Sequence, residues 1–389
     1  MYQHNLEISY IEYTSGESFD TDLRKCLEEL TLINNDPNHT ILKITVFNKC
    51  SSIVDYESKY GKLTSLLETS NITIPFSLIS QAPKNEQSLV IEVWSLNDSN
   101  NNSYSTHHYK GINYGLLIDS LDKYLILSAN SFSELSFEKN TSLVFEVVNE
   151  LLIKEGFEFS DIIRQWNYIE DIFTITPKNG KAIQNYQIFN DYRSSYYSKV
   201  HFKNGFPAAT GIGTRNGGYT IELIALKNNS NSCILPITNP IQTNAHAYSK
   251  EMLADSATST VINKTTPKFE RAKCIHNYKE GLIYVSGTAS ILNEKTVFEN
   301  NISEQTLLVC RAIDALLSKE NPTISSLKMS DNSNQRILNY RVYVRNRKDI
   351  DIVESICKTH FGNVPTIIVE ADICRENLLV EVEGVMSYE

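Results

Sequence analysis

Two glutamates near the carboxyl end of the chain have the residue type and spacing for acid chemistry. In LLVEVEG, strand alternation puts Glu381 and Glu383 on one face and Val380 and Val382 on the other. If that face borders an enclosed site, burial raises the pKa of a carboxyl group, which can then act as a general acid near neutral pH. A solvated edge strand with exposed charges is the alternative.

A cysteine lies seven residues before the first of these glutamates. Cys374 precedes Arg375 at a predicted turn. A neighbouring cation can lower the pKa of a thiol and activate it as a nucleophile. A buried, inert thiol is the alternative.

Two segments rich in small residues would let a ligand approach the backbone closely. FPAATGIGTRNGG (Phe206 to Gly218) surrounds Arg215 with glycines, and its backbone N–H groups could face an anion. It lacks the GxGxxG and GK[ST] spacings of nucleotide sites, and a β-bulge with a tight turn is the alternative. YVSGTAS (Tyr284 to Ser290) offers Ser286 and Thr288 as donors, unless it is a strand end packed under a helix.

These segments belong to an internal repeat. YLILSANS and LIYVSGTAS read as corresponding strands, with Ser128 and Ser286 at 158 positions apart. Each is followed by a helix with an apolar stripe (141–156 and 303–319, the latter with Ser303 as N-cap) and by a strand (161–169 and 337–344). A second helix then leads to Pro207 or Pro365 and to a final strand with a glutamate, which pairs Glu222 with Glu381.

The order β, α, β, α, β in each half predicts an α+β fold of two units, each a mostly antiparallel sheet with helices on one face. Residues 227–266, rich in Asn, Ser and Thr, are expected to form a long exposed connection. We therefore expect an N-terminal domain over 1–235 and a C-terminal domain over 236–389. The first hundred residues do not align with the repeat; they contain a predicted helix near Leu23 and a predicted loop near Ser99.

Composition excludes several classes of function. The 389 residues carry a formal net charge of −10 with no dense Lys/Arg run, which argues against a nucleic-acid partner. No signal peptide and no membrane-spanning apolar run are present, so we expect a cytoplasmic protein with no membrane partner. Seven scattered cysteines without a CxxC pair, and histidines without an HExxH motif, predict neither a disulfide framework nor a metal site.

Five blocks together resemble the chorismatase family, whose C-terminal half is similar to the YjgF/RidA fold. They are FPAATGIG, NPIQTNAHAYS, PKFERA, YVSGTASI and ADICRENLLVEVEG, and the resemblance covers roughly Phe189 to the C-terminus. It implies two YjgF/RidA-like (chorismate-mutase-like) units, no metal and no cofactor. It also implies chorismate as the small-molecule substrate, hydrolysed with release of pyruvate in secondary-metabolite biosynthesis. Glu381 corresponds to the family's acid, and Cys374 and Gly287 match positions that differ between diol-forming and aromatising members.

Chorismate carries two carboxylates, for which arginine is the suited partner. The candidates next to matching blocks are Arg215, Arg193 and Arg271, with Thr210, Gly211, Tyr284 and Gly287 as further substrate-binding candidates. Because Cys374 and Gly287 occur together, we expect 3-hydroxybenzoate as the product. 4-Hydroxybenzoate and a dihydroxycyclohexadiene carboxylate are the alternatives.

Two other functions remain as hypotheses. Enamine or imine deamination of the YjgF/RidA kind is disfavoured because residues 365–372 lack the arginine that those enzymes carry before the terminal glutamate. The third hypothesis is a non-catalytic metabolite-binding protein.

One position departs from the family pattern. After the block YVSGTASI many family members continue with Gly-His, whereas this chain has Leu292, Asn293 and Glu294. By analogy with YjgF/RidA packing, we expect a monomer with an internal pseudo-trimer, or a homotrimer.

Overall fold

Three large β-sheets form the framework of the computed structural model. The structure describes residues 5–15, 18–97, 102–119, 122–132, 135–178, 181–228, 233–249, 265–277, 280–327 and 335–388. Within these residues the large sheets have four, six and seven strands, and two small two-stranded sheets accompany them.

The first sheet lies in the N-terminal hundred residues. Its strand order is β1 (Leu6–Tyr13), β5 (Leu89–Asn97), β2 (His39–Phe47), β3 (Phe76–Ile79). Helix α1 (Phe19–Asn35) connects β1 to β2, and α2 (Ile53–Thr69) connects β2 to β3. Each helix begins at a serine, Ser18 or Ser52, whose hydroxyl accepts a hydrogen bond from a first-turn N–H group.

The second sheet spans residues 102–227. Its strand order is β12 (Ala208–Thr214), β9 (Ile162–Glu170), β13 (Tyr219–Lys227), β8 (Asp122–Ser131), β7 (Ile112–Asp119), β6 (Asn102–Tyr109). Helix α3 (Phe137–Lys154) connects β8 to β9, and α4 (Asn185–Tyr197) precedes β12. A small hairpin of β10 (Ile175–Lys178) and β11 (Lys181–Gln184) leads into α4.

The third sheet contains the C-terminal strand in its interior. Its strand order is β14 (Cys233–Ile237), β15 (Ala272–Asn277), β16 (Glu280–Ala289), β21 (Val380–Tyr388), β19 (Gln335–Val344), β20 (Thr366–Glu370), β4 (Ala82–Pro83). Helices α6 (Ile302–Leu317) and α8 (Ile350–Phe361) flank β19 in the chain, and α7 (Pro322–Ser326) is a short helix between them. Strands β17 (Ile291–Leu292) and β18 (Lys295–Thr296) form a small hairpin after β16.

The same four-stranded motif occurs in all three sheets. The orders β8–β13–β9–β12 and β16–β21–β19–β20 repeat β1–β5–β2–β3, with two antiparallel pairings followed by one parallel pairing. This confirms the α+β class and the repeat. It also identifies the N-terminal hundred residues as a further sheet of the same kind. The two-domain division stays a prediction; its boundary at 235/236 falls within β14, which pairs with β15.

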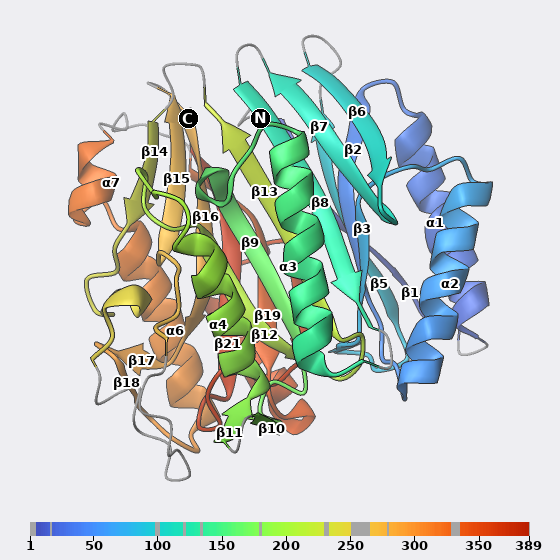
Figure 1. The fold of residues 1–389 in the computed structure, drawn as a ribbon. Helices are drawn as coiled ribbons and strands as arrows, with labels where there is room; N and C mark the ends of the chain where they lie inside the picture. Colours follow the sequence, from blue (N-terminus) through green and yellow to red (C-terminus); the bar gives the residue numbers. More distant parts are fainter. Residues whose placement is uncertain are drawn as a thin grey trace.

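The helices lie outside and the sheets face one another. Figure 1 shows α1 and α2 on one side, α3 and α4 on another and α6 on a third, around the strands. Three hydrophobic clusters fill the space between each sheet and its helices, and a fourth, with residues from all three sheets, fills the centre. Strands β9, β13 and β21 are buried along nearly their whole length, so the charged residues on them also lie inside the protein.

Three local predictions need correction or fall outside the described residues. Helix α6 begins two residues earlier than expected, because Asn301 rather than Ser303 is the N-cap and accepts from the N–H of Glu304. Part of the predicted exposed connection, residues 233–249, is built into the structure through β14 and the buried Gln242. Of the predicted loop near Ser99, residues 98–101 lie outside the described residues, whereas residues 102–105 belong to strand β6, so the loop prediction was wrong there.

Strand register corrects the pairing of the glutamates. Glu92, Glu222 and Glu383 occupy the same place, each on the last strand of its motif and opposite the corresponding residue of the middle strand. The counterpart of Glu222 is therefore Glu383 and not Glu381. A slip of two residues keeps both glutamates on the same face, so alternation could not reveal it.

The position of Glu381 holds a different residue in each of the three motifs. Its counterparts are Val90 and Thr220. Strand β16 has a bulge between Val285 and Thr288, whereas the corresponding pairs β1–β5 and β8–β13 run without a register shift. Bulges are common next to active sites because they redirect the backbone.

Candidate active site

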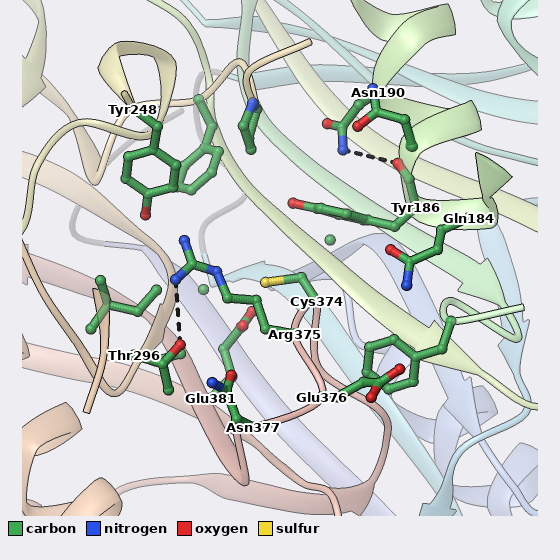
Figure 2. A pocket seen from close by; sticks show the side chains of 18 of the residues that line it. Gln184, Tyr186, Asn190, Tyr248, Thr296, Cys374, Arg375, Glu376, Asn377 and Glu381 are labelled. Carbon is green, nitrogen blue, oxygen red and sulfur yellow. Dashed lines mark hydrogen bonds between the residues drawn. The ribbon is translucent and has the colours of Figure 1, made fainter. Parts of the chain in front are cut away.

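A cavity of about 850 Å³ lies where the second sheet meets the third. Helix α4 and strand β12 form one wall, and β16, β21 and the loop of residues 371–379 form the other. Figure 2 shows Tyr186, Cys374, Arg375 and Glu381 directed toward its interior. The lining includes Phe173, Gln184, Tyr186, Gln187, Asn190, Gly211, Tyr248, Phe269, Arg271, Gly287, Lys295, Thr296, Glu299, Cys374, Arg375, Glu376, Asn377 and Glu381.

Glu381 is a buried carboxyl group on the wall of this cavity. Its strand β21 lies between β16 and β19, so the alternative of an exposed edge strand is wrong. Only 4% of the residue is exposed, and no described group of the chain donates a hydrogen bond to its carboxyl oxygens. Burial, together with the charge of Glu383, raises the pKa of Glu381 to about 8, against the opposing effect of Arg164 and Arg271. At neutral pH Glu381 therefore carries a proton that it can donate.

Glu383, two residues along the strand, lies in the opposite environment. Its carboxylate accepts hydrogen bonds from Arg164 Nη2 (2.5 Å), Trp166 Nε1 (2.7 Å) and the hydroxyl of Tyr343 (3.1 Å). The Thr210 hydroxyl donates to it as well. A carboxylate can only accept, and these donors satisfy it. The two acids on one face of β21 thus have different roles.

The bulge in β16 places Gly287 against the catalytic candidate. A Cβ atom built on Gly287 would overlap the carboxyl group of Glu381 and come within 3.2 Å of Thr210 Cγ2. The Gly287 N–H donates to Thr210 Oγ1 at 3.1 Å. Glycine at this position therefore allows the close approach of the carboxyl group, and Thr210 holds the peptide in place.

Cys374 lies beside Glu381 as a neutral thiol. Burial raises the pKa of Cys374 to about 12, and the charge of Glu381 adds to this effect. The Tyr186 hydroxyl, which is directed into the same cavity, acts to lower this pKa. Arg375, the neighbouring cation, opposes the shift without reversing it, so the residue is not an activated thiolate.

Two arginines supply positive charge to the cavity. Arg271 donates through Nε and Nη2 to the carbonyl oxygen of Thr243 and through Nη2 to the hydroxyl of Tyr248. Arg375 donates through Nη1 to the Glu294 carbonyl oxygen at 2.9 Å and to Thr296 Oγ1 at 3.3 Å. Each guanidinium group keeps N–H donors that no described residue of the chain accepts from, and these donors are available to an anion.

The other two arginine candidates do not line the cavity. Arg215 is exposed and pairs with Asp372 at 3.3 Å, so it supports the base of the 371–379 loop. Arg193 is buried behind the wall, where it donates to Oδ1 of Asn190 and lies over the ring of Phe189.

The remaining sequence candidates divide between the wall and the interior. Gly211 and Gly287 line the cavity. Tyr284 belongs to the central core, and Thr210 is buried beneath Gly287. Ser286 donates to the Glu270 carbonyl oxygen, and the Thr288 hydroxyl donates to the Ser286 carbonyl oxygen, so both serve the backbone.

Three further residues line the cavity although no sequence pattern predicted them: Tyr186, Asn190 and Tyr248. Tyr186 and Asn190 are one turn apart on α4, just where the matching blocks begin. Tyr248 lies in the block NPIQTNAHAYS. That block was the available signal, although it carries no recognisable chemical motif.

Within the described residues, no group of three or more His, Cys, Asp or Glu side chains could hold a metal ion. Among these residues there is also no helix long and apolar enough to cross a membrane.

Comparison with known proteins gives matches along most of the chain. The model of the FkbO/Hyg5-like chorismatase N-terminal region matches residues 93–225, and the model named endoribonuclease L-PSP matches residues 268–387. A crystal structure of a chorismatase superposes with a TM-score of 0.67 at 21% identity, covering 98% of each chain. This likeness establishes the common fold.

Two curated relatives are similar in sequence. A 3-hydroxybenzoate synthase of Streptomyces hygroscopicus is 30% identical over 256 residues, covering 64% of this chain and 70% of the relative. A chorismatase of the same organism is 26% identical over 283 residues, covering 71% and 76%. With the motif blocks, the shared fold and these matches together, the chain belongs to the chorismatase family.

Proposed function

We propose that this protein converts chorismate into 3-hydroxybenzoate and pyruvate. The observation that carries the proposal is the buried Glu381 carboxyl group, whose pKa burial raises to about 8, on the wall of a cavity that also receives two arginines. The relative named 3-hydroxybenzoate synthase, 30% identical, supports this product.

Glu381 begins the reaction as a general acid. It protonates the methylene carbon of the enolpyruvyl ether, the ether becomes an oxocarbenium ion, and Glu381 becomes a carboxylate. The neighbouring ring hydroxyl then attacks, the bond to the pyruvyl oxygen breaks, and loss of a ring proton gives the aromatic product. 3-Hydroxybenzoate and pyruvate together contain the same atoms as chorismate, so no net water is consumed. A diol product would take up one water.

Arg271 and Arg375 are suited to the two carboxylates of the substrate. They approach the cavity from different elements, one before β15 and one on the 371–379 loop, and both keep unused N–H donors. Arginine binds carboxylates in a fixed planar geometry, which orients the ether toward Glu381. Of the other sequence candidates, Arg193 contributes positive charge from behind the cavity wall. Arg215 supports the 371–379 loop through its ion pair with Asp372.

Cys374 and Gly287 favour the aromatic product. The thiol remains protonated at neutral pH because its pKa is about 12, so it cannot activate a water for attack. Gly287 leaves room for the Glu381 carboxyl group close to the substrate. After the first proton transfer, the Glu381 carboxylate is the base nearest the ring.

The test is incubation of the protein with chorismate in D2O, followed by chromatography and mass spectrometry. We expect 3-hydroxybenzoate and pyruvate in equal amounts, with one deuterium in the pyruvate methyl group. Absence of pyruvate at every pH would refute catalysis and leave metabolite binding or imine deamination. The diol or 4-hydroxybenzoate as sole product would refute the product assignment.

A further inference from the structure

Glu383 does not line the cavity, yet it is connected to the catalytic carboxyl group by a short chain of contacts. Arg164 Nη2 donates to Glu383 Oε2 at 2.5 Å and to Thr210 Oγ1 at 2.9 Å. The Thr210 hydroxyl donates its proton to Glu383 and accepts from the Gly287 N–H. Gly287 lies directly against the carboxyl group of Glu381.

These contacts leave Thr210 with one possible orientation. Its hydroxyl oxygen accepts two hydrogen bonds and its hydrogen is donated to a carboxylate, so its bonding capacity is used fully. The peptide at Gly287 is therefore held by the ion pair and not only by the strand ladder, which the bulge interrupts here.

Related contacts exist where the first sheet meets the second. Lys43 Nζ donates to Glu222 Oε2 at 2.8 Å, and the hydroxyls of Ser77 and Thr45 donate to the same carboxylate. Thr220 stands there in the place of Glu381. One function of such a pair is to join two sheets. Glu222 and Glu383 both lie near Arg341, at 3.8 and 3.4 Å, but only Glu383 accepts from the Thr210 hydroxyl that holds the Gly287 peptide, so Glu222 is the control for loss of a buried carboxylate.

We propose that Glu383, with Arg164 and Thr210, is a positioning group that fixes Gly287 beneath the carboxyl group of Glu381. The inference deepens the proposed function and rests on it. Glu383 acts through its fixed negative charge, which opposes ionisation of the neighbouring acid.

Several other charged or titratable groups face Glu381. They are Arg164 on β9, Tyr186 on α4, Arg271 before β15, and Cys374 and Arg375 on the 371–379 loop. The arginines act in the direction opposite to Glu383. Removal of the Glu383 charge would thus leave Arg164 unopposed beside Glu381.

The experiment compares Glu383→Gln with Glu222→Gln. In the wild type, kcat falls above about pH 8, where Glu381 loses its proton. In E383Q this limb moves toward acid by about one pH unit or more, so kcat at pH 8 falls about fivefold or more, because the protonated fraction of Glu381 drops from about one half to about one tenth, and it recovers near pH 6. E222Q lowers the melting temperature and leaves the pH profile unchanged. An unshifted profile in E383Q would overturn the proposal.

A second pair of variants covers the case in which E383Q does not fold. Thr210→Ser keeps the hydroxyl group, whereas Thr210→Val has nearly the same shape without it. We expect T210V to lose kcat by about tenfold with little change in KM, and T210S to retain wild-type kcat. Equal kcat in T210V and wild type would contradict the positioning role.

A spectroscopic readout separates this inference from the proposed reaction. In protein labelled with carbon-13 at the glutamate carboxyl groups, the signal lost in Glu381→Gln reports the titration of Glu381. We expect this signal to titrate at lower pH in E383Q than in wild type. If wild type does not convert chorismate, the proposed function fails, while an unshifted titration would overturn the role of Glu383 independently.

Discussion

Two interfaces between sheets are built from corresponding elements of the repeated motif, yet one encloses a cavity and the other is filled by side chains. Where the second sheet meets the third, the cavity opens between α4 and β21. Where the first sheet meets the second, the rings of Tyr56, Tyr60 and Phe132 pack together with centroids 5.0 to 6.2 Å apart. We call these the open interface and the filled interface. Tyr56 also packs against Gly217 and donates to the Leu78 carbonyl oxygen at 2.9 Å.

The difference shows how few residues separate a site from a packed interface. At the filled interface Thr220 stands where the open interface has Glu381, and β8 runs without the bulge that β16 has. The buried acid and basic partner are present at both, as Glu222 with Lys43 and Glu383 with Arg164. The ion pair therefore belongs to the scaffold, and the bulge and the additional glutamate belong to the site.

The largest effect is expected from Glu381→Gln. Glutamine keeps the shape but cannot protonate the enol ether, so kcat should fall about a thousandfold or more. Steady-state release of pyruvate from chorismate measures it. The matched control at the filled interface, Thr220→Val, should leave kcat unchanged. Wild-type activity in E381Q would remove the basis for distinguishing the two interfaces.

Gly287→Ala should reduce kcat by about a hundredfold. The added methyl group would occupy the position of the Glu381 carboxyl group, and a small misplacement of a catalytic group is costly. Gly61→Ala on α2, where the added Cβ would have no neighbour within 4 Å, is the control for a glycine substitution. Undiminished turnover in G287A would show that the bulge is irrelevant to the site.

Stability should depend on pH differently in wild type and E381Q. The folded pKa of Glu381, about 8, lies above the unfolded value of 4.5, so its stabilising contribution is complete below pH 4.5 and is lost as the pH rises through 8. Glutamine does not titrate. E381Q should therefore gain roughly 1.4 kcal/mol relative to wild type per pH unit in this range, about 3 kcal/mol by pH 7. Urea unfolding at pH 5 and pH 7 measures it, and parallel curves would contradict it.

The smallest effects should come from removing one hydroxyl at each interface. Tyr56→Phe leaves the Leu78 carbonyl oxygen without this donor and should cost about 1 kcal/mol of stability with kcat unchanged. Tyr186→Phe removes a hydroxyl that lines the cavity and acts to lower the pKa of the Cys374 thiol, and it should alter kcat or the product ratio a few-fold at nearly unchanged stability. Thermal melts and product chromatography distinguish them; equal behaviour of both variants would mean that the interfaces do not differ in function.

The sequence was sufficient for the repeated strands and helices of the second and third sheets, but not for strands β6, β7, β14 and β15. The strands around Ser128 and Ser286 and the helices after them form where periodicity predicts them. The first sheet escaped detection because its strands share the fold but few residue types with the others. Packing in the shared core constrains only volume and polarity, and many sequences satisfy it.

The sequence predicted some of the residues that line the cavity and missed others. Glu381, Cys374, Gly287 and Arg271 come together at the cavity, and the sequence blocks had marked all four. Arg215 was misplaced because a glycine-rich segment beside a cation resembles an anion site, whereas its guanidinium pairs with Asp372. Tyr186 went unnoticed since only tertiary contact brings α4 to the 371–379 loop.

The three motifs share a single polypeptide, and this has a consequence for how the molecule can change. In a ring of identical subunits every substitution appears at each interface at once. Here Lys43, Arg164 and Asn339 hold the same place in three motifs and have become three different residues. Each interface can therefore vary alone, so that one cradles a reactive carboxyl group while another gains stability from aromatic packing.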